Sequence, residues 1–104
     1  MKKTRIAVLV SGGGTNLQAL LDAQHSGKLP HGEIVAVISS QIDAYALDRA
    51  AKAGVPGYAV SRKELGSQEA FEAGISRLLA QYRVELVILA GFMSILSENF
   101  TRKW

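Results

Sequence analysis

The pattern of hydrophobic positions divides this chain into alternating strands and helices. Four short apolar runs predict strands, at 5–10, 33–39, 58–60 and 85–90, and all but the third are typical of strands buried on both faces. Between them, apolar residues at three- and four-residue spacing predict amphipathic helices. This alternation indicates an α/β fold in which right-handed crossovers join parallel strands.

The first helix has a signal at each end. Thr15 and Gln18 have the spacing of a capping box, which predicts that the helix starts at Thr15 or Asn16. Gly27 readily adopts the left-handed conformation that ends many helices, so we expect the helix to stop near it.

Two further helices follow along the chain. Asp43 predicts the N-cap of a helix over 44–53, and Gly54 predicts its end. Three side chains of this helix are expected to face inward: Leu47, Ala50 and Ala51. Ser67 predicts the start of a longer helix that reaches Arg83. Its apolar stripe consists of Phe71, Ile75, Leu78, Leu79 and Tyr82.

The order of the strands decides where a ligand can bind. We expect the order 3-2-1-4, which is half of a doubly wound sheet with helices on both faces. Ligands of open α/β sheets bind at the carboxyl ends of the strands, where the strand order reverses. The loop Ser11–Asn16 follows the first strand and the segment from Gly91 follows the fourth, so both are expected to line one cleft.

The loop Ser11–Asn16 contains three glycines and leads directly into the first helix. Glycines let a ligand approach the backbone, and the helix start offers free N–H groups and the positive end of the helix dipole. The dipole alone contributes about 0.3–2 kcal/mol to a bound phosphate. Because Asn16 can also donate its side-chain amide, the loop predicts a phosphate site, with a purely structural tight turn as the alternative.

The common nucleotide motifs fit this loop poorly. The third glycine of the dinucleotide fingerprint falls on Leu17, and Ser39-Ser40-Gln41 stands where that fingerprint has an acidic residue. No Gly-Lys-Ser/Thr closes the loop as in a P-loop. The loop therefore predicts an anion site of another kind.

Composition narrows the class of protein further. The 104 residues form one domain, 1–104, and 48% hydrophobic with 20% charged residues is typical of a soluble globular protein. No apolar run has the length of a membrane helix and no cleavage pattern follows the basic start, which predicts a cytoplasmic protein without a membrane partner.

The charge pattern and the lack of cysteine argue against nucleic-acid-binding proteins and thiolate metalloproteins. The absence of cysteine rules out disulfides and thiolate metal sites, and His25 and His31 are expected to be exposed and non-catalytic. The net charge of +3 is scattered along the chain, so nucleic-acid binding is not expected. A modest positive field still helps to collect an anionic small molecule.

Three stretches of the chain resemble the phosphoribosylglycinamide formyltransferases, the folate-dependent enzymes of purine synthesis. They are 11–19, the residues 39–40 with 43–47, and 89–97, and the resemblance covers essentially the whole chain. It implies the amino-terminal half of a formyltransferase-type, Rossmann-like fold. It also implies a reaction in which the amine of glycinamide ribonucleotide attacks the formyl carbon of 10-formyltetrahydrofolate, without a metal.

The resemblance implies roles for individual residues. Three would hold the substrate phosphate, as the chemistry of the loop also suggests: Gly14, Thr15 and Asn16. Four would form one wall of the folate pocket: Met93, Ser94, Ile95 and Leu96. Many members have arginine at the position of Ser94 and some have a folate-contacting arginine at that of Gln68, so weaker binding of the folate glutamate tail is expected.

The family's catalytic groups do not occur within residues 1–104. In the family, Asn and His lie in an Asn-x-His-Pro-Ser segment beyond the fourth strand, and a catalytic Asp follows further on. General acid–base catalysis and oxyanion stabilisation need such groups. The expectation is therefore the substrate-binding half of a transformylase, with no catalytic residue and no activity of its own.

Two other functions remain open from the sequence. One is a formyltetrahydrofolate hydrolase, in which water replaces the amine, and the other is a non-enzymatic phosphate- or nucleotide-binding module. The apolar strand Glu85–Ala90 is expected to lie at an edge of the sheet, so self-association through it is also predicted.

Overall fold

A computed structural model describes residues 4–10, 14–28, 32–40, 45–60 and 66–90 of the chain. Four parallel strands form one sheet in the order β3-β2-β1-β4, which confirms the order predicted from the sequence. The strands are β1 (Thr4–Val10), β2 (Gly32–Ser39), β3 (Gly57–Ala59) and β4 (Leu86–Leu89). The helices are α1 (Thr15–His25), α2 (Tyr45–Lys52) and α4 (Gln68–Gln81).

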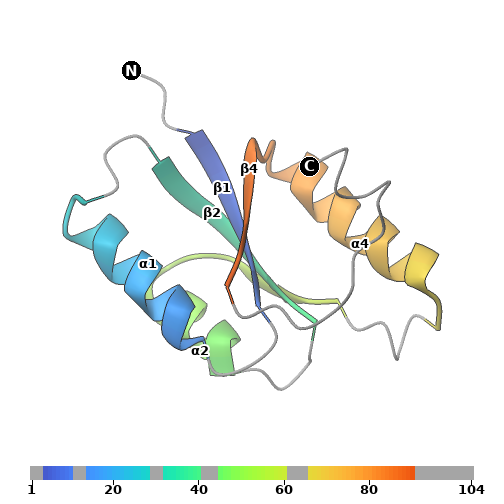
Figure 1. Ribbon diagram of the computed structural model, residues 1–104, viewed down its shortest axis with the longest axis horizontal. Coiled ribbons are helices and arrows are strands. Elements are labelled where there is room, and N and C mark those ends of the chain that lie inside the picture. The colour runs from blue at the N-terminus through green and yellow to red at the C-terminus, as the bar shows by residue number, and fades with distance from the viewer. Residues whose placement is uncertain (1–3, 11–13, 29–31, 41–44, 61–65, 91–104) are drawn as a thin grey trace.

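The sheet is covered on both faces, as a doubly wound fold requires. Figure 1 shows α1 and α2 together on one face and α4 on the other. Alternate residues of β1 divide between the two cores, since Val8 packs with the first two helices and Leu9 with α4. Both side chains are fully buried, which confirms that β1 is buried on both faces.

Strand β4 is also expected to be buried on both faces, but it is not. Leu86 is 46% exposed and Leu89 is 55% exposed, while Val87 and Ile88 are half-buried. The prediction of a strand buried on both faces is therefore wrong for β4, whereas its predicted place at an exposed edge of the sheet is confirmed. The reason is its place at the end of the strand order, where it pairs with β1 on one side.

Helix α1 begins and ends where the sequence indicates, but its start has a different cap. Gly14 is the N-cap and no side chain caps the helix, so the predicted capping box is wrong. The carboxyl end confirms the role of Gly27, which has φ 81°. Its N–H donates to Gln24 O and that of Lys28 to Ala23 O, which together form a Schellman motif.

Helix α2 faces the sheet with a slightly different set of residues. Ala46 and Ala50 are fully buried and Leu47 packs against the same core. Ala51 is exposed, so the prediction that it faces inward is wrong, because the buried alanines lie four residues apart and Ala51 falls outside their stripe. The proposed cap Asp43 lies outside the described residues.

Helix α4 follows its sequence signals closely. The hydroxyl of Ser67 accepts a hydrogen bond from Ala70 N at 3.1 Å, which confirms Ser67 as the N-cap. Three residues of the predicted stripe are fully buried and the other two are partly buried against them: Phe71, Ile75 and Leu79, with Leu78 and Tyr82.

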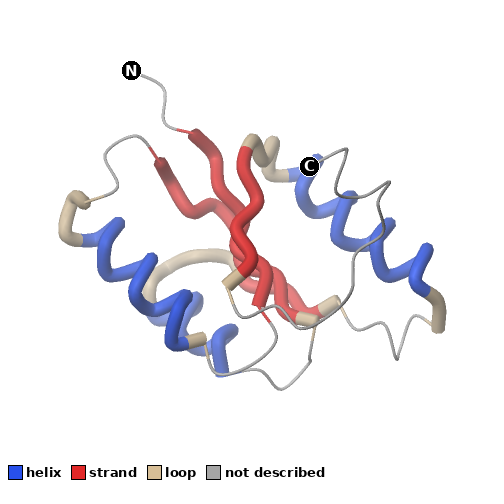
Figure 2. Tube along the Cα trace, in the orientation of Figure 1, coloured by secondary structure: helices blue, strands red, loops and turns tan. Residues whose placement is uncertain are grey.

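Strand ends and helix starts meet at one edge of the sheet. The carboxyl ends of the strands and the amino ends of α1 and α4 lie at the same edge, the lower one in Figures 1 and 2. This is the edge at which open α/β sheets bind ligands.

Candidate functional site

The first turn of α1 lies at the carboxyl edge of the sheet, directly after β1. Thr15 and Asn16 are exposed there, whereas Leu17 is fully buried and anchors the turn. The first bond inside the helix runs from Gln18 N to Gly14 O at 2.8 Å. The N–H groups that precede it have no carbonyl one turn earlier in the helix, which is the arrangement that suits an anion at a helix start.

Gly14 joins this turn to the second helix. It has φ 83°, and a Cβ placed on it would lie 2.7 Å from Ala46 Cβ and 2.9 Å from Ala46 Cα. Those distances are shorter than any van der Waals contact, so the backbone of α2 approaches to a point that only glycine permits. Gly14 therefore has a packing role that the sequence alone did not indicate.

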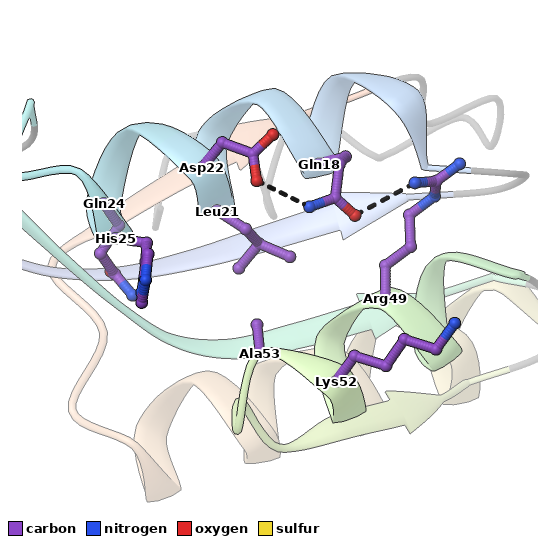
Figure 3. A pocket seen from close by; sticks show the side chains of 8 residues that line it. All are labelled: Gln18, Leu21, Asp22, Gln24, His25, Arg49, Lys52 and Ala53. Carbon is purple, nitrogen blue, oxygen red and sulfur yellow. Dashed lines mark hydrogen bonds between the residues drawn. The ribbon is translucent and has the colours of Figure 1, made fainter.

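A chain of polar contacts lies beside the same turn (Figure 3). Arg49 Nη1 of α2 donates to Gln18 Oε1 at 3.1 Å, and Gln18 Nε2 donates to Asp22 Oδ1 at 2.9 Å. The Arg49 guanidinium also stacks on the ring of Tyr45, 4.8 Å from its centroid. These contacts orient the Gln18 amide and hold a positive charge next to the start of α1.

A cavity of about 300 Å³ extends between α1 and α2. It is lined by Gln18, Leu21, Asp22, Gln24, His25, Arg49, Lys52 and Ala53. Several of its polar groups bond to the protein itself, including Gln24 Oε1, which accepts a hydrogen bond from Ile34 N. This cavity runs along the helices rather than over the carboxyl edge of the sheet, so it is distinct from the predicted cleft.

The structure brings together only part of the predicted site. Gly14, Thr15 and Asn16 lie in one turn, as expected. Gln68 begins α4, at the same edge but on the opposite face, and its Nε2 donates to Glu72 Oε2 at 2.8 Å. The folate-wall residues predicted at positions 93–96 lie outside the described residues.

Other features that would mark a function in the described part of the chain are a reactive histidine, a metal-binding cluster and a membrane-spanning helix. His25 is exposed at the carboxyl end of α1, as expected. Within the described ranges, no three His, Asp or Glu side chains gather in the way a metal site needs. None of the described helices is long and apolar enough to cross a membrane.

Sequence reasoning missed Ala46 and Arg49, both on α2. A signal for them exists in retrospect, because Ala46 and Ala50 form a small-residue face on which another backbone can lie closely. Arg49 lies beside that face, so its long side chain reaches along the neighbouring helix. Neither feature identifies Gly14 as the partner without the tertiary structure.

The sheet order, the two helix layers and the glycine-capped helix start define an α/β protein of the doubly wound class, in which that helix start lies at the carboxyl edge of the sheet. Within that class, the chain belongs to the formyl transferase family, whose sequence profile matches residues 4–104.

Individual relatives are similar over nearly the whole chain. The trifunctional purine biosynthetic protein adenosine-3 of Drosophila pseudoobscura pseudoobscura is 48% identical over 103 residues, covering 98% of this chain and 8% of the relative. The phosphoribosylglycinamide formyltransferase of Haemophilus influenzae is 44% identical over 104 residues, covering 100% of this chain and 48% of the relative. The chain thus spans about half the length of the latter.

Solved structures agree with the fold. The phosphoribosylglycinamide formyltransferase of Coxiella burnetii superimposes with a TM-score of 0.92 at 39% identity, covering 99% of this chain and 48% of that one. The glycinamide ribonucleotide transformylase 1 of Symbiobacterium toebii superimposes with a TM-score of 0.90 at 40% identity, covering 98% of this chain and 48% of that one.

Proposed function

We propose that the protein containing this chain transfers a formyl group from 10-formyltetrahydrofolate to glycinamide ribonucleotide in purine biosynthesis. The family match supports this proposal, together with the Haemophilus influenzae relative, which is 44% identical and named for that activity. In the reaction, the glycinamide nitrogen forms a bond to the formyl carbon and the bond from that carbon to the folate nitrogen breaks. The proton lost by the amine is returned to the folate nitrogen, giving tetrahydrofolate.

The first turn of α1 is the proposed site for the substrate phosphate. Its exposed residues Thr15 and Asn16 carry backbone N–H groups at the positive end of the helix, and no acidic side chain occupies that turn. Backbone donors at a helix start bind phosphate without rearrangement. This combination at the carboxyl edge of the sheet is the observation on which the proposal depends.

The folate is proposed to lie across the same edge. Met93, Ser94, Ile95 and Leu96 are assigned to its pocket by resemblance, with backbone groups meeting the pterin and apolar side chains covering it. Gln68, at the amino end of α4, is assigned to the folate tail. Because both Gln68 and Ser94 lack the charge of arginine, we expect somewhat weaker binding of the anionic tail than in members that have arginine there.

The chain by itself is proposed to bind substrate without catalysing transfer. Its 104 residues include no Asn-x-His-Pro-Ser segment to supply general acid–base catalysis. We further propose a cytoplasmic protein without nucleic-acid or membrane partners. Self-association through β4 is proposed as well, since Leu86 and Leu89 expose apolar surface on an edge strand.

Calorimetric titration tests the binding proposal. The chain is titrated separately with glycinamide ribonucleotide, with a 10-formyltetrahydrofolate analogue and with NAD as a dinucleotide control. Binding of the first two and not of the third is expected. Tight binding of NAD with no binding of the ribonucleotide would contradict the proposal, and phosphate binding without folate preference would favour a non-enzymatic module.

Activity assays of the full-length protein separate the two enzymatic alternatives. A transformylase forms the N-formyl product only when glycinamide ribonucleotide is present. A formyltetrahydrofolate hydrolase releases formate with water alone, so formate release at the same rate without the ribonucleotide would contradict the proposed reaction.

A further inference from the structure

Arg49 occupies an unusual electrostatic position relative to α1. A helix start is stabilised by carboxylates in its first turn, because the dipole is positive there. The first turn of α1 has no acidic residue, and instead the Arg49 guanidinium of α2 bonds to Gln18 beside that turn. Both features oppose the stability of an empty helix start, and both favour an anion bound to it.

The geometry also makes Arg49 part of a rigid support. Its guanidinium is held by Gln18 Oε1 at 3.1 Å and by the Tyr45 ring at 4.8 Å. Its Cδ would lie 3.2 Å from a Cβ on Gly14, so the aliphatic stem runs directly along the N-cap. Asp22 completes the arrangement, because it fixes the Gln18 amide with the oxygen turned toward Arg49.

We infer that Arg49, acting through Gln18, is a positioning residue for the anion site at the start of α1. It holds the first turn against α2 at the Gly14–Ala46 contact, and its charge adds to the positive potential of the helix start. This inference rests on the proposed function for the identity of the anion, the phosphate of glycinamide ribonucleotide. It assigns the specificity of the site partly to α2.

Lys52 provides a matched control on the same helix. Arg49 and Lys52 both lie in the last turn of α2, where a cation stabilises that helix, and both approach the Tyr45 ring. Lys52 Nζ is 5.8 Å from the ring centroid. The variants Arg49→Gln and Lys52→Gln therefore remove the same charge from the same helix end, but only the first removes the donor to Gln18.

Two measurements on the whole chain test the inference. Amide hydrogen exchange without ligand reports opening of the first turn of α1, through the Gln18 N–H that donates to Gly14 O. Titration with glycinamide ribonucleotide reports the affinity of the site. Arg49→Gln is expected to speed exchange at Gln18 and to weaken binding by about tenfold, the scale on which a side-chain network couples to a site. Lys52→Gln is expected to change either quantity by less than about twofold.

A double-mutant cycle with Gln18→Met distinguishes positioning from general loss of stability. If the two residues act as one unit, the double variant binds no more weakly than Arg49→Gln alone. Three outcomes would each overturn the inference. The Gln18 N–H could exchange at an unchanged rate in Arg49→Gln, Lys52→Gln could have effects equal to those of Arg49→Gln, or the losses of affinity in Arg49→Gln and Gln18→Met could add fully in the double variant. Failure of the unaltered chain to bind the ribonucleotide would reject the proposed function and the assigned anion, while the exchange comparison still decides whether Arg49 positions the turn.

Discussion

Gly14 and Ala46 meet where α1 begins, so closely that a Cβ on Gly14 would lie 2.7 Å from Ala46 Cβ. This contact sets the distance between the two helices at the edge where the proposed substrate binds. It also explains why position 14 is a glycine. The N-cap has φ 83° and its Cα packs against the backbone of Ala46, and only glycine allows both.

The Gly14→Ala variant is expected to lower the free energy of unfolding by about 2–5 kcal/mol, combining left-handed strain with overpacking. Gly27→Ala is the matched control, because Gly27 has φ 81° but nothing within 4 Å of a Cβ. That variant retains only the backbone strain, about 1–2 kcal/mol. Urea unfolding of both variants checks the difference, and equal losses would show that the Ala46 contact contributes nothing.

Asn16 provides a second prediction, in which stability and binding move in opposite directions. Asn16→Ala is expected to weaken binding of glycinamide ribonucleotide by about 1–3 kcal/mol if its amide meets a charged oxygen. Asn16→Asp is expected to weaken binding further by repulsion, yet to stabilise the ligand-free chain by about 0.3–1 kcal/mol through the helix dipole. Calorimetry and thermal unfolding measure the two effects, and unchanged affinity in Asn16→Ala would remove its proposed role.

The tyrosine pair formed by β3 and the end of α4 predicts a pH dependence. The hydroxyls of Tyr58 and Tyr82 are hydrogen-bonded, and this bond, with a smaller effect of burial, raises the pKa of Tyr82 above its ordinary value. Because the folded state holds the proton more tightly than the unfolded state, the stabilisation is complete below the ordinary tyrosine pKa of about 10. It is lost as the pH rises through the raised pKa.

The Tyr82→Phe variant isolates this contribution. The difference in unfolding free energy between the unaltered chain and the variant is expected to shrink as the pH increases above about 10. Urea unfolding across a series of alkaline buffers measures it. A difference that stays constant over that range would mean that the Tyr82 proton is not linked to folding.

Strand β4 predicts the behaviour of the chain in solution. Leu86 and Leu89 expose apolar surface on a strand that pairs with β1 at the end of the sheet order, so self-association at tens of micromolar is expected. The double variant Leu86→Lys with Leu89→Lys is expected to sediment as a monomer, because charged side chains block edge pairing. A monodisperse monomer for the unaltered chain would contradict the proposal.

Much of the fold around the candidate site could be predicted because its signals are local. The start of α1 at Thr15 depends on a glycine turn after an apolar strand, and Ser67 caps α4 through a bond to a residue three positions away. Local rules failed at Gln18, where the spacing of a capping box was present but the side chain bonds to Asp22 and Arg49 instead. Because Gly14 and not Thr15 is the N-cap, Gln18 lies four residues after the cap, and its amide bonds within the helix and to α2.

The sequence by itself determined the elements and the strand order, since hydrophobic periodicity and crossover handedness leave few alternatives. It also predicted the edge of the sheet at which we propose that a ligand binds. Only the tertiary structure decided that Gly14 lies against Ala46 and that Arg49 reaches the first turn of α1. Those facts depend on distances between elements far apart in the chain. Such distances are set by how the helices pack on the sheet, and no single segment of sequence encodes them.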